Sequence, residues 1–313
     1  MMKISNAVAS SVGNGIADDA LKDEDNGIWL VDQPSPVQAV WQERFYWIRW
    51  VDRLAEQEQI VQPGGAQFAA FYGAWQRLAA QGRLAAGDRH WVVLQQIEAA
   101  WFNPLAGTQH GAEIAAWDCY MAAIADYHQP QLTIATLQDY ETMLDRLAGA
   151  CFQLLPFLAE HHRVSARRFG MVDQFYNNLR DLYEDAQQGI CYFPTELLAQ
   201  FGLTPTDVVT LRCLTHPGFR PLMQFWVETY LPRLRQRHLT LMVAADLHPT
   251  WQGLTTWFAH RYHRIETIMQ TCQYDFVAFA DCYWATVRAE LAQQHQQRQP
   301  SLAAPARSLV QHH

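Results

Sequence analysis

Three carboxylates lie close together in the stretch NNLRDLYEDAQQG, residues 177–189. In a helix, Asp181, Glu184 and Asp185 would occupy about one and a half turns, with Arg180 beside them and no lysine partner on that face. Clustered carboxylate oxygens are the ligands that Mg²⁺ prefers, and a neighbouring arginine suits a phosphate held by the metal. The residue types therefore suggest a divalent-metal and phosphate site.

The same spacing also fits an ordinary surface helix. Over residues 171–188 the apolar side chains fall on one side and the polar side chains on the opposite side. Most charged helix faces are simply solvated, so the spacing alone favours this second interpretation. The polar face consists of Gln174, Asn177, Asn178, Asp181, Glu184, Asp185 and Gln188.

A second charged helix face occurs upstream in FYWIRWVDRLAEQE, residues 45–58. Arg49, Asp52, Arg53 and Glu56 share one side, and apolar residues cover the other. The ordinary explanation is a ladder of surface salt bridges, each contributing roughly a few tenths of a kcal/mol. Taken alone, this segment favours that explanation. We call residues 45–58 the first acidic segment and residues 177–189 the second acidic segment.

The composition excludes several classes of protein. Of 313 residues, 50% are hydrophobic, 12% aromatic and 17% charged, which predicts a sizeable folded core. The net charge of −8 disfavours nucleic-acid binding. Six scattered cysteines without a CxxC pair, and an N-terminus without an apolar leader, favour the reducing cytoplasm. No apolar run reaches about 18 residues, so no transmembrane helix is expected.

The pattern along the chain predicts an all-α protein. Helical periodicity is nearly continuous, Pro and Gly mark the connections, and short alternating strands bounded by tight turns are missing. We expect one domain at 36–296 between flexible tails at 1–35 and 297–313. The expected helices lie near 37–59, 65–81, 89–101, 112–127, 135–160, 165–188, 217–237, 250–272 and 275–296.

The region 173–203 resembles the second aspartate-rich motif of the squalene/phytoene synthase family. That motif has the approximate form Q-x-x-N-x-x-R-D-x-x-E-D-x-x-x-G-x-x-Y-x-P. So many matches at fixed offsets are far more specific than a single acidic pair. The matching residues are Gln174, Asn177, Arg180, Asp181, Glu184, Asp185, Gly189, Tyr192 and Pro194.

Two further segments resemble the family in the same order along the chain. The first acidic segment is similar to F-C-R-x-x-D-D-x-x-D, with Arg49 and Asp52 matching. Residues 137–150 are similar to the Y-C-x-x-V-A-G segment, and Asp126 is aligned with an aspartate that precedes it. The likeness covers roughly 38–290 and is strong only at 173–203. The residues in register at 137–150 are Tyr140, Ala148 and Gly149.

The resemblance implies an all-α isoprenoid-synthase-type helical bundle with a central apolar cavity. It implies that Mg²⁺ on both acidic segments grips the diphosphates of two prenyl diphosphates, farnesyl or geranylgeranyl, which condense head to head to a C30 or C40 product. Nothing in the sequence indicates NADPH. The resemblance implies catalytic roles for Asp52, Asp181, Asp185 and Tyr140. It implies metal binding by Asp52, Glu56, Asp181, Glu184 and Asp185. It implies diphosphate binding by Arg49, Arg53, Gln174, Asn177 and Arg180, and a prenyl pocket at Gly149 and Phe152.

The chain departs from the family pattern at three of these positions. Arg53 stands where a second aspartate is usual, and Glu56 replaces a third. Phe152 replaces the second glycine of A-G-x-x-G, which predicts a bulky ring in the prenyl tunnel. Two alternatives therefore stay open: a terpene-synthase-like enzyme that ionises a single prenyl diphosphate, and a non-catalytic interaction or assembly protein. Apolar substrates are compatible with peripheral membrane contact, and the sequence does not give the oligomeric state.

A last candidate is the histidine pair in HRYHRIE, where His260, His263 and Glu266 would lie along one helical edge. An HxxH pair without further ligands is a weak zinc signal. Surface or capped histidines are the favoured interpretation here.

Overall fold

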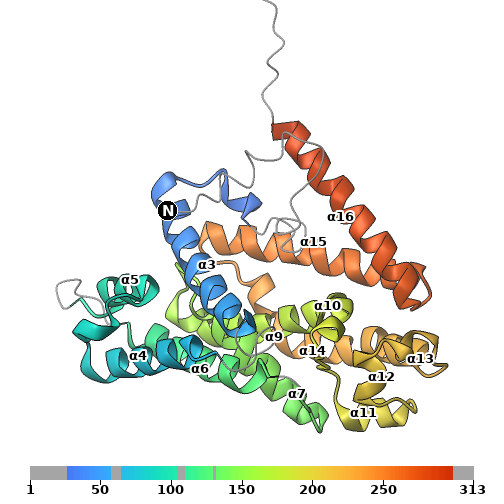
Figure 1. The fold of residues 1–313 in the computed structure, drawn as a ribbon. Coiled ribbons are helices and arrows are strands. Elements are labelled where there is room, and N and C mark those ends of the chain that lie inside the picture. The colour runs from blue at the N-terminus through green and yellow to red at the C-terminus, as the bar shows by residue number, and fades with distance from the viewer. Residues whose placement is uncertain (1–26, 58–64, 104–109, 130–131, 299–313) are drawn as a thin grey trace, which may run out of the picture. The chain divides into compact units, whose positions relative to one another are not determined.

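Helices make up all the regular secondary structure of the described residues, 27–57, 65–103, 110–129 and 132–298, in the computed structural model (Figure 1). The predicted all-α class is thereby confirmed. The chain divides into two compact units, Trp29–Phe279 and the two terminal stretches Met1–Ile28 and Ala280–His313. All candidate residues belong to Trp29–Phe279. The predicted tails fall mainly outside the described residues, and the single domain at 36–296 stays a prediction.

The first part of the unit Trp29–Phe279 contains four α-helices and two short 3₁₀ turns. Their boundaries agree with the predicted helices to within a few residues. The elements are η1 (Ile28–Leu30), α3 (Ser35–Ala55), α4 (Gln67–Gln81), η3 (Ala86–Asp88), α5 (Val92–Trp101) and α6 (Gly111–Tyr127).

The middle of the chain carries the second acidic segment and consists of shorter helices. One of them, η5, is a π-helical turn between two α-helices. The elements are α7 (Leu137–Leu144), η5 (Asp145–Gly149), α8 (Ala150–Phe152), η6 (Glu160–His162), α9 (Arg163–Arg180), α10 (Leu182–Gln187), α11 (Thr195–Gln200) and α12 (Pro205–Val209).

The last part ends in two long helices. A second π-helical turn, η8, again joins two α-helices. The elements are η7 (Arg212–Thr215), α13 (Phe219–Gln224), η8 (Phe225–Tyr230), α14 (Leu231–His238), η9 (Leu239–Val243), α15 (Pro249–Thr271) and α16 (Phe276–Arg298). Within the described residues, none of the helices combines the length and the hydrophobicity that crossing a bilayer requires.

Helix α3 shows how the sequence pattern sets the orientation of the first acidic segment. Trp41, Trp47, Val51 and Ala55 are fully buried, and their spacings of six, four and four residues keep them on one side of a helix. The Trp47 ring packs edge-on at 5.4 Å from the Trp101 ring. Because this face is fixed in the core, the charged residues between these positions must lie on the other side.

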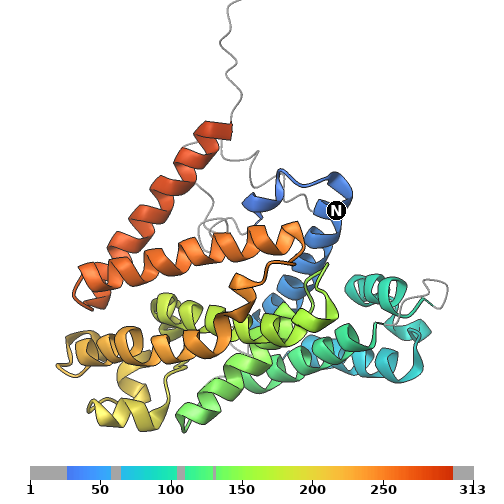
Figure 2. The same ribbon diagram turned by 180° about the vertical axis from the view of Figure 1, so that it is seen from behind.

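Helix α9 lies in the middle of the unit Trp29–Phe279, between α4 to α6 at one end and α11 to α13 at the other (Figures 1 and 2). Gly170 allows it to approach η5 and α8 closely. A Cβ atom at Gly170 would lie 2.3 Å from the carbonyl oxygen of Ala148 and 2.9 Å from Cδ2 of Phe152. Only glycine therefore fits at this contact.

The predicted helix at 165–188 is two helices, α9 and α10, which meet at Asp181. Asp181 has φ −92° and ψ 14°, outside regular helical geometry. No proline or glycine marks this break in the sequence. The predicted helix at 135–160 likewise ends early, at Phe152, because the chain turns before Pro156.

Candidate active site

The first acidic segment places two carboxylates against a buried histidine. Asp52 and Glu56 lie one turn apart at the end of α3, and His128 directly follows α6. Nε2 of His128 lies 3.0 Å from Oδ1 of Asp52. One ligand atom from each of the three residues lies within 4.8 Å of the others. The pKa of His128 is raised: burial lowers it, but the hydrogen bond with Asp52 and the charges of Asp52 and Glu56 outweigh burial.

The second acidic segment is organised around the break at Asp181. Arg180 is 7% exposed, and its guanidinium donates two hydrogen bonds to the Asp181 carboxylate. The Nε–Oδ1 distance is 2.6 Å and the Nη2–Oδ2 distance is 2.7 Å. The cation expected to bind diphosphate and the carboxylate expected to bind metal are therefore paired with each other here. Glu184 and Asp185 follow in α10, and both are half-buried.

Tyr192 connects the two acidic segments. Burial raises its pKa well above the usual value, and the negative charges of Asp185, Asp52, Glu56 and Asp181 raise it further. Carboxylates from α3 and from the second acidic segment therefore act on the same phenol. This convergence is the arrangement that a shared clamp for an anionic ligand and its metal ions requires.

A tight turn brings Tyr192 back toward the carboxylates. Gly189 adopts a φ of +73°, a left-handed conformation that glycine takes without strain. The N–H of Ile190 then donates to the carbonyl of Asp185 at 2.8 Å. The chain thus reverses just after α10, which explains why the motif has glycine three residues before its tyrosine.

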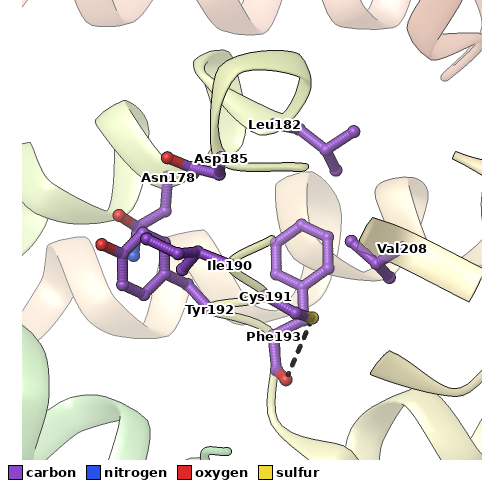
Figure 3. Close-up of a pocket in the computed structure, with 8 residues that line it drawn as sticks. All are labelled: Asn178, Leu182, Asp185, Ile190, Cys191, Tyr192, Phe193 and Val208. Carbon is purple, nitrogen blue, oxygen red and sulfur yellow. Dashed lines mark hydrogen bonds between the residues drawn. The ribbon is translucent and has the colours of Figure 1, made fainter. Parts of the chain in front are cut away.

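A small pocket opens beside this turn (Figure 3). Asn178, Asp185 and Tyr192 gather on one side of it, and apolar side chains including Leu182 and Val208 lie on the other. Its enclosed space has room for about one water molecule. Ligand pockets usually measure roughly 300–1,000 Å³, so this pocket alone is far smaller than a prenyl chain needs.

Polar residues of α9 form a buried network with Tyr140. Nε2 of Gln174 donates to Oδ1 of Asn178 at 2.8 Å, and Nδ2 of Asn178 donates to the Tyr140 hydroxyl at 3.2 Å. Burial raises the pKa of Tyr140, and the charge of Asp185 adds to the rise. Tyr140 therefore lies within the field of Asp185, and its catalytic role stays a prediction. Gln174, expected to bind diphosphate, contacts Asn178, and its expected role stays a prediction.

A buried carboxylate that the sequence did not suggest lies one turn before Asn177. Asp173 is 6% exposed and accepts hydrogen bonds from the Arg261 guanidinium and from the Tyr262 hydroxyl, the latter at 3.0 Å. Nδ2 of Asn177 also donates to it, at 3.2 Å. This contact ties α9 to α15. The buried Oδ1 of Asn177 has no hydrogen-bond partner among the residues that the structure describes.

The remaining predicted residues are distributed around this centre. Arg49 is half-buried and Arg53 exposed, both on α3. Gly149 is buried at the contact of η5 with α9, where a Cβ atom would lie 3.1 Å from the backbone oxygen of Arg167. Phe152 is buried between the rings of Phe169 and Phe258, with centroids at 5.4 and 5.8 Å.

The resemblance aligned Asp126 with a family aspartate. In the structure its Oδ2 pairs with Nη2 of Arg146 at 2.6 Å. His128, two residues later, is the side chain that contacts Asp52. Tyr192 belonged to the matched motif, but it had been given no role. No spacing rule could have found His128, because it is 76 residues from Asp52 along the chain.

The histidine pair on α15 does not assemble a metal site in the part of the chain that the structure describes. His260 and His263 are exposed. Glu266 instead accepts a hydrogen bond from Tyr176 and pairs with Arg235 at 2.7 Å. These contacts support the interpretation as surface histidines.

Comparison with known proteins decides the family. The model of the squalene/phytoene synthase family matches residues 44–277. The chain belongs to the squalene/phytoene synthase family. The matched range contains both acidic segments and every residue to which the resemblance assigned a role. Family membership supports a function of the isoprenoid-synthase type.

Individual relatives resemble shorter parts of the chain. A bifunctional lycopene cyclase/phytoene synthase of Colletotrichum graminicola is 37% identical over 89 residues, 24% of this chain and 15% of that protein. One from Arthroderma gypseum is 34% identical over 98 residues, 27% of this chain and 16% of that protein. The matches thus span less than a fifth of these curated relatives. The squalene synthase HpnC from Alicyclobacillus acidocaldarius is similar in structure, with 16% identity, a TM-score of 0.48 and coverage of 94% of this chain and 92% of that one.

Proposed function

We propose that this squalene/phytoene synthase family member is a Mg²⁺-dependent prenyltransferase that condenses two farnesyl or geranylgeranyl diphosphates head to head. The observation that carries the proposal is the convergence of carboxylates from both acidic segments on Tyr192. Diphosphate departs readily only when its charge is neutralised, and two facing acidic segments are suited to hold the neutralising cations.

The donor set of the second acidic segment fits Mg²⁺. Asp181, Glu184 and Asp185 offer carboxylate oxygens, and the side-chain oxygen of Asn177 is buried without a hydrogen-bond partner among the described residues. An oxygen in that situation suits a cation ligand. When bound, Mg²⁺ would neutralise charge on the leaving diphosphate as a Lewis acid.

The side chains around the carboxylates supply donors for the anion. Tyr192 is protonated at neutral pH, as any tyrosine is, and presents an O–H donor beside these carboxylates. We assign diphosphate binding to Arg180, which would exchange its contact with Asp181 for a substrate oxygen. Arg49 and Arg53 occupy α3 beside Asp52 and extend the cationic part of the site.

The prenyl chains require apolar space next to these donors. The pocket beside Tyr192 is small, so we propose that substrate binding displaces aromatic side chains. Phe152 is the first candidate, because it fills the contact between α8 and α9 where the family usually has glycine. Apolar walls at this place would also exclude water from an allylic cation.

A product assay tests the proposal. Purified protein is incubated with each prenyl diphosphate and Mg²⁺, with and without NADPH, and both hydrocarbons and pyrophosphate are measured. We expect a C30 or C40 product that disappears in Asp181→Asn. Products of a single chain length would instead support the terpene-synthase-like alternative. The absence of both pyrophosphate and hydrocarbon would refute both enzymatic proposals.

One observation favours the non-catalytic alternative. Two of the proposed metal ligands already have cationic partners within the protein: Arg180 pairs with Asp181, and His128 contacts Asp52. A scaffold that never binds metal would use these pairs to neutralise its carboxylates. Titration of the protein with preformed Mg²⁺–pyrophosphate, corrected by the same titration into buffer, separates the two, since a scaffold would give no heat beyond that control. Cytoplasmic location and peripheral membrane contact stay predictions.

A further inference from the structure

We propose that Asp52, Glu56 and His128 form a binding site for one divalent transition-metal ion of the Mn²⁺, Co²⁺ and Zn²⁺ kind. The inference deepens the proposed function, because it assigns a metal class to the first acidic segment. A catalytic use of this metal site rests on the proposed function, but the binding experiment that tests the site does not. The second acidic segment keeps the oxygen ligands that suit Mg²⁺.

The geometry brings together three ligand atoms from two helices. Asp52 and Glu56 project from successive turns at the end of α3, and His128 approaches from the end of α6. Nε2 of His128 is 3.0 Å from Oδ1 of Asp52, and all three ligand atoms lie within 4.8 Å of one another. Ligands bonded at about 2.1 Å to one ion are separated by roughly 3–4 Å. Small side-chain rotations would therefore complete the site.

The burial of His128 is the second, independent observation. Its side chain is 10% exposed, whereas that of Asp52 is 40% exposed. Nε2 points at Asp52, and the backbone of Ile124 also contributes a hydrogen bond to the ring. Burying a polar ring beside two carboxylates is costly unless the charges there are compensated. Coordination of an ion by Nε2 would compensate that cost and would explain why the ring is directed at two carboxylates.

The chemistry of the ligand set argues for a transition metal over Mg²⁺. Mg²⁺ takes oxygen ligands in a rigid octahedron, whereas imidazole nitrogen favours Zn²⁺, Co²⁺ and their neighbours. The aspartate-rich pattern that the first acidic segment resembles has three carboxylates, but here an exposed Arg53 replaces one. Asp52 and Glu56 remain, and the imidazole of His128 lies beside them as a third ligand. Two carboxylates and one nitrogen make a mixed set that discriminates against Mg²⁺.

A second histidine cluster provides a matched control. His161 and His162 each contact one oxygen of Asp246, with both Nε2–oxygen distances at 2.8 Å. The side chains of His161 and Asp246 are 64% and 63% exposed, so this cluster is open to solvent where His128 is not. This cluster would bind added metal adventitiously, so a variant there tests whether a signal comes from His128.

The experiment is a titration of the metal-free, full-length protein with Co²⁺ and, separately, with Mn²⁺ and Mg²⁺. We expect Co²⁺ to give visible absorption bands, and bound Mn²⁺ to show ¹⁴N coupling in pulsed electron paramagnetic resonance. In His128→Gln both signals should be lost, with affinity for Mn²⁺ weakened by at least about tenfold. His162→Gln should retain both signals. Circular dichroism checks that each variant is folded.

Three results would overturn the inference: no Co²⁺ or Mn²⁺ binding by the unaltered protein, signals that survive in His128→Gln, or equal affinity of this site for Mg²⁺ and Mn²⁺. If His128→Gln does not fold, Glu56→Gln removes a half-exposed ligand and must weaken Mn²⁺ binding instead. Metal binding without product formation would count against the proposed function alone. Product formation without ¹⁴N coupling would count against this site alone.

Discussion

Arg180 and Asp181, neighbours in the chain, form a two-pronged ion pair at the break between α9 and α10. The guanidinium contacts both carboxylate oxygens, at 2.6 and 2.7 Å. The side chains are only 6% and 14% exposed, so the pair is largely shielded from water and each charge helps to neutralise the other. The same two residues are the proposed diphosphate and metal ligands, which makes the pair a resting arrangement that ligand binding would open.

Replacing the arginine of this pair should destabilise the protein. In Arg180→Gln the Asp181 carboxylate loses its cationic partner, and we expect the free energy of unfolding to fall by about 3 kcal/mol. Urea denaturation followed by circular dichroism measures the change. Added Mg²⁺ should restore part of the loss, because an ion that binds only the folded carboxylate stabilises it.

Two further variants control this experiment. Arg212→Gln removes an arginine whose side chain is 65% exposed beside Asp207, and it should have far less effect. In Arg180→Gln/Asp181→Asn the carboxylate is gone, so Mg²⁺ should no longer restore stability. Rescue that persists in the double variant would show that the ion acts elsewhere.

The sequence predicted the helices better than the place where one of them breaks. Periodicity located α3, α4 and α6 within a few residues, because each buries one continuous apolar face. It missed the break at Asp181, which coincides with the Arg180 contact and is marked by neither glycine nor proline. A conformation that depends on a side-chain ion pair leaves little trace in hydrophobic periodicity.

The sequence predicted only those candidate site residues that belong to the recognised motifs. The motif resemblance brought Asp52 and Asp181 into one proposed site, and the field of both on Tyr192 agrees with that placement. His128 was missed because histidine at the end of a helix is common and its partner is distant in sequence. Asp173 was missed because its buried partner, Arg261, lies 88 residues away on α15. Such contacts depend on tertiary structure.

Glycine at position 170 should be irreplaceable. In Gly170→Ala the new Cβ would meet the carbonyl oxygen of Ala148 at 2.3 Å, so α9 must move away from η5. We expect a loss of about 3 kcal/mol in the free energy of unfolding. Gly73→Ala in α4 is the matched control, because its Cβ would meet only Arg77 Nη1 at 3.5 Å. That change should stabilise the helix by up to about 1 kcal/mol. Equal effects of the two substitutions would contradict the close contact.

The buried tyrosines should make the protein sensitive to alkali. Their phenols have raised pKa values in the folded chain, chiefly through burial, while an unfolded chain ionises them near 10.0. This contribution to stability is complete below pH 10 and is lost as the pH rises further, because only the unfolded chain then releases protons. The residues concerned are the buried Tyr120, Tyr140, Tyr176, Tyr230 and Tyr262 and the half-buried Tyr192.

Urea denaturation between pH 8 and 12, with absorbance at 295 nm, checks this dependence. Tyr274 should ionise before the deeply buried tyrosines, since burial and the contact with Glu228 raise its pKa only to about 12. Ionisation of the deeply buried phenols should coincide with the loss of circular dichroism. Phenolate absorbance that reaches half of its final value at pH 10 in a protein with native circular dichroism would contradict their burial.

Phe152 offers a test of where a prenyl chain would lie. Its ring fills the space between Phe169 and Phe258, so Phe152→Ala should leave a cavity and lower the free energy of unfolding by about 3–5 kcal/mol. Phe157→Ala removes a ring that is 42% exposed and should have little effect. If Phe152 limits the prenyl pocket, the smaller side chain should increase turnover of geranylgeranyl diphosphate relative to farnesyl diphosphate, because the longer chain needs the added volume. An unchanged ratio in a folded, active Phe152→Ala variant would place the pocket elsewhere and leave Phe152 as core packing.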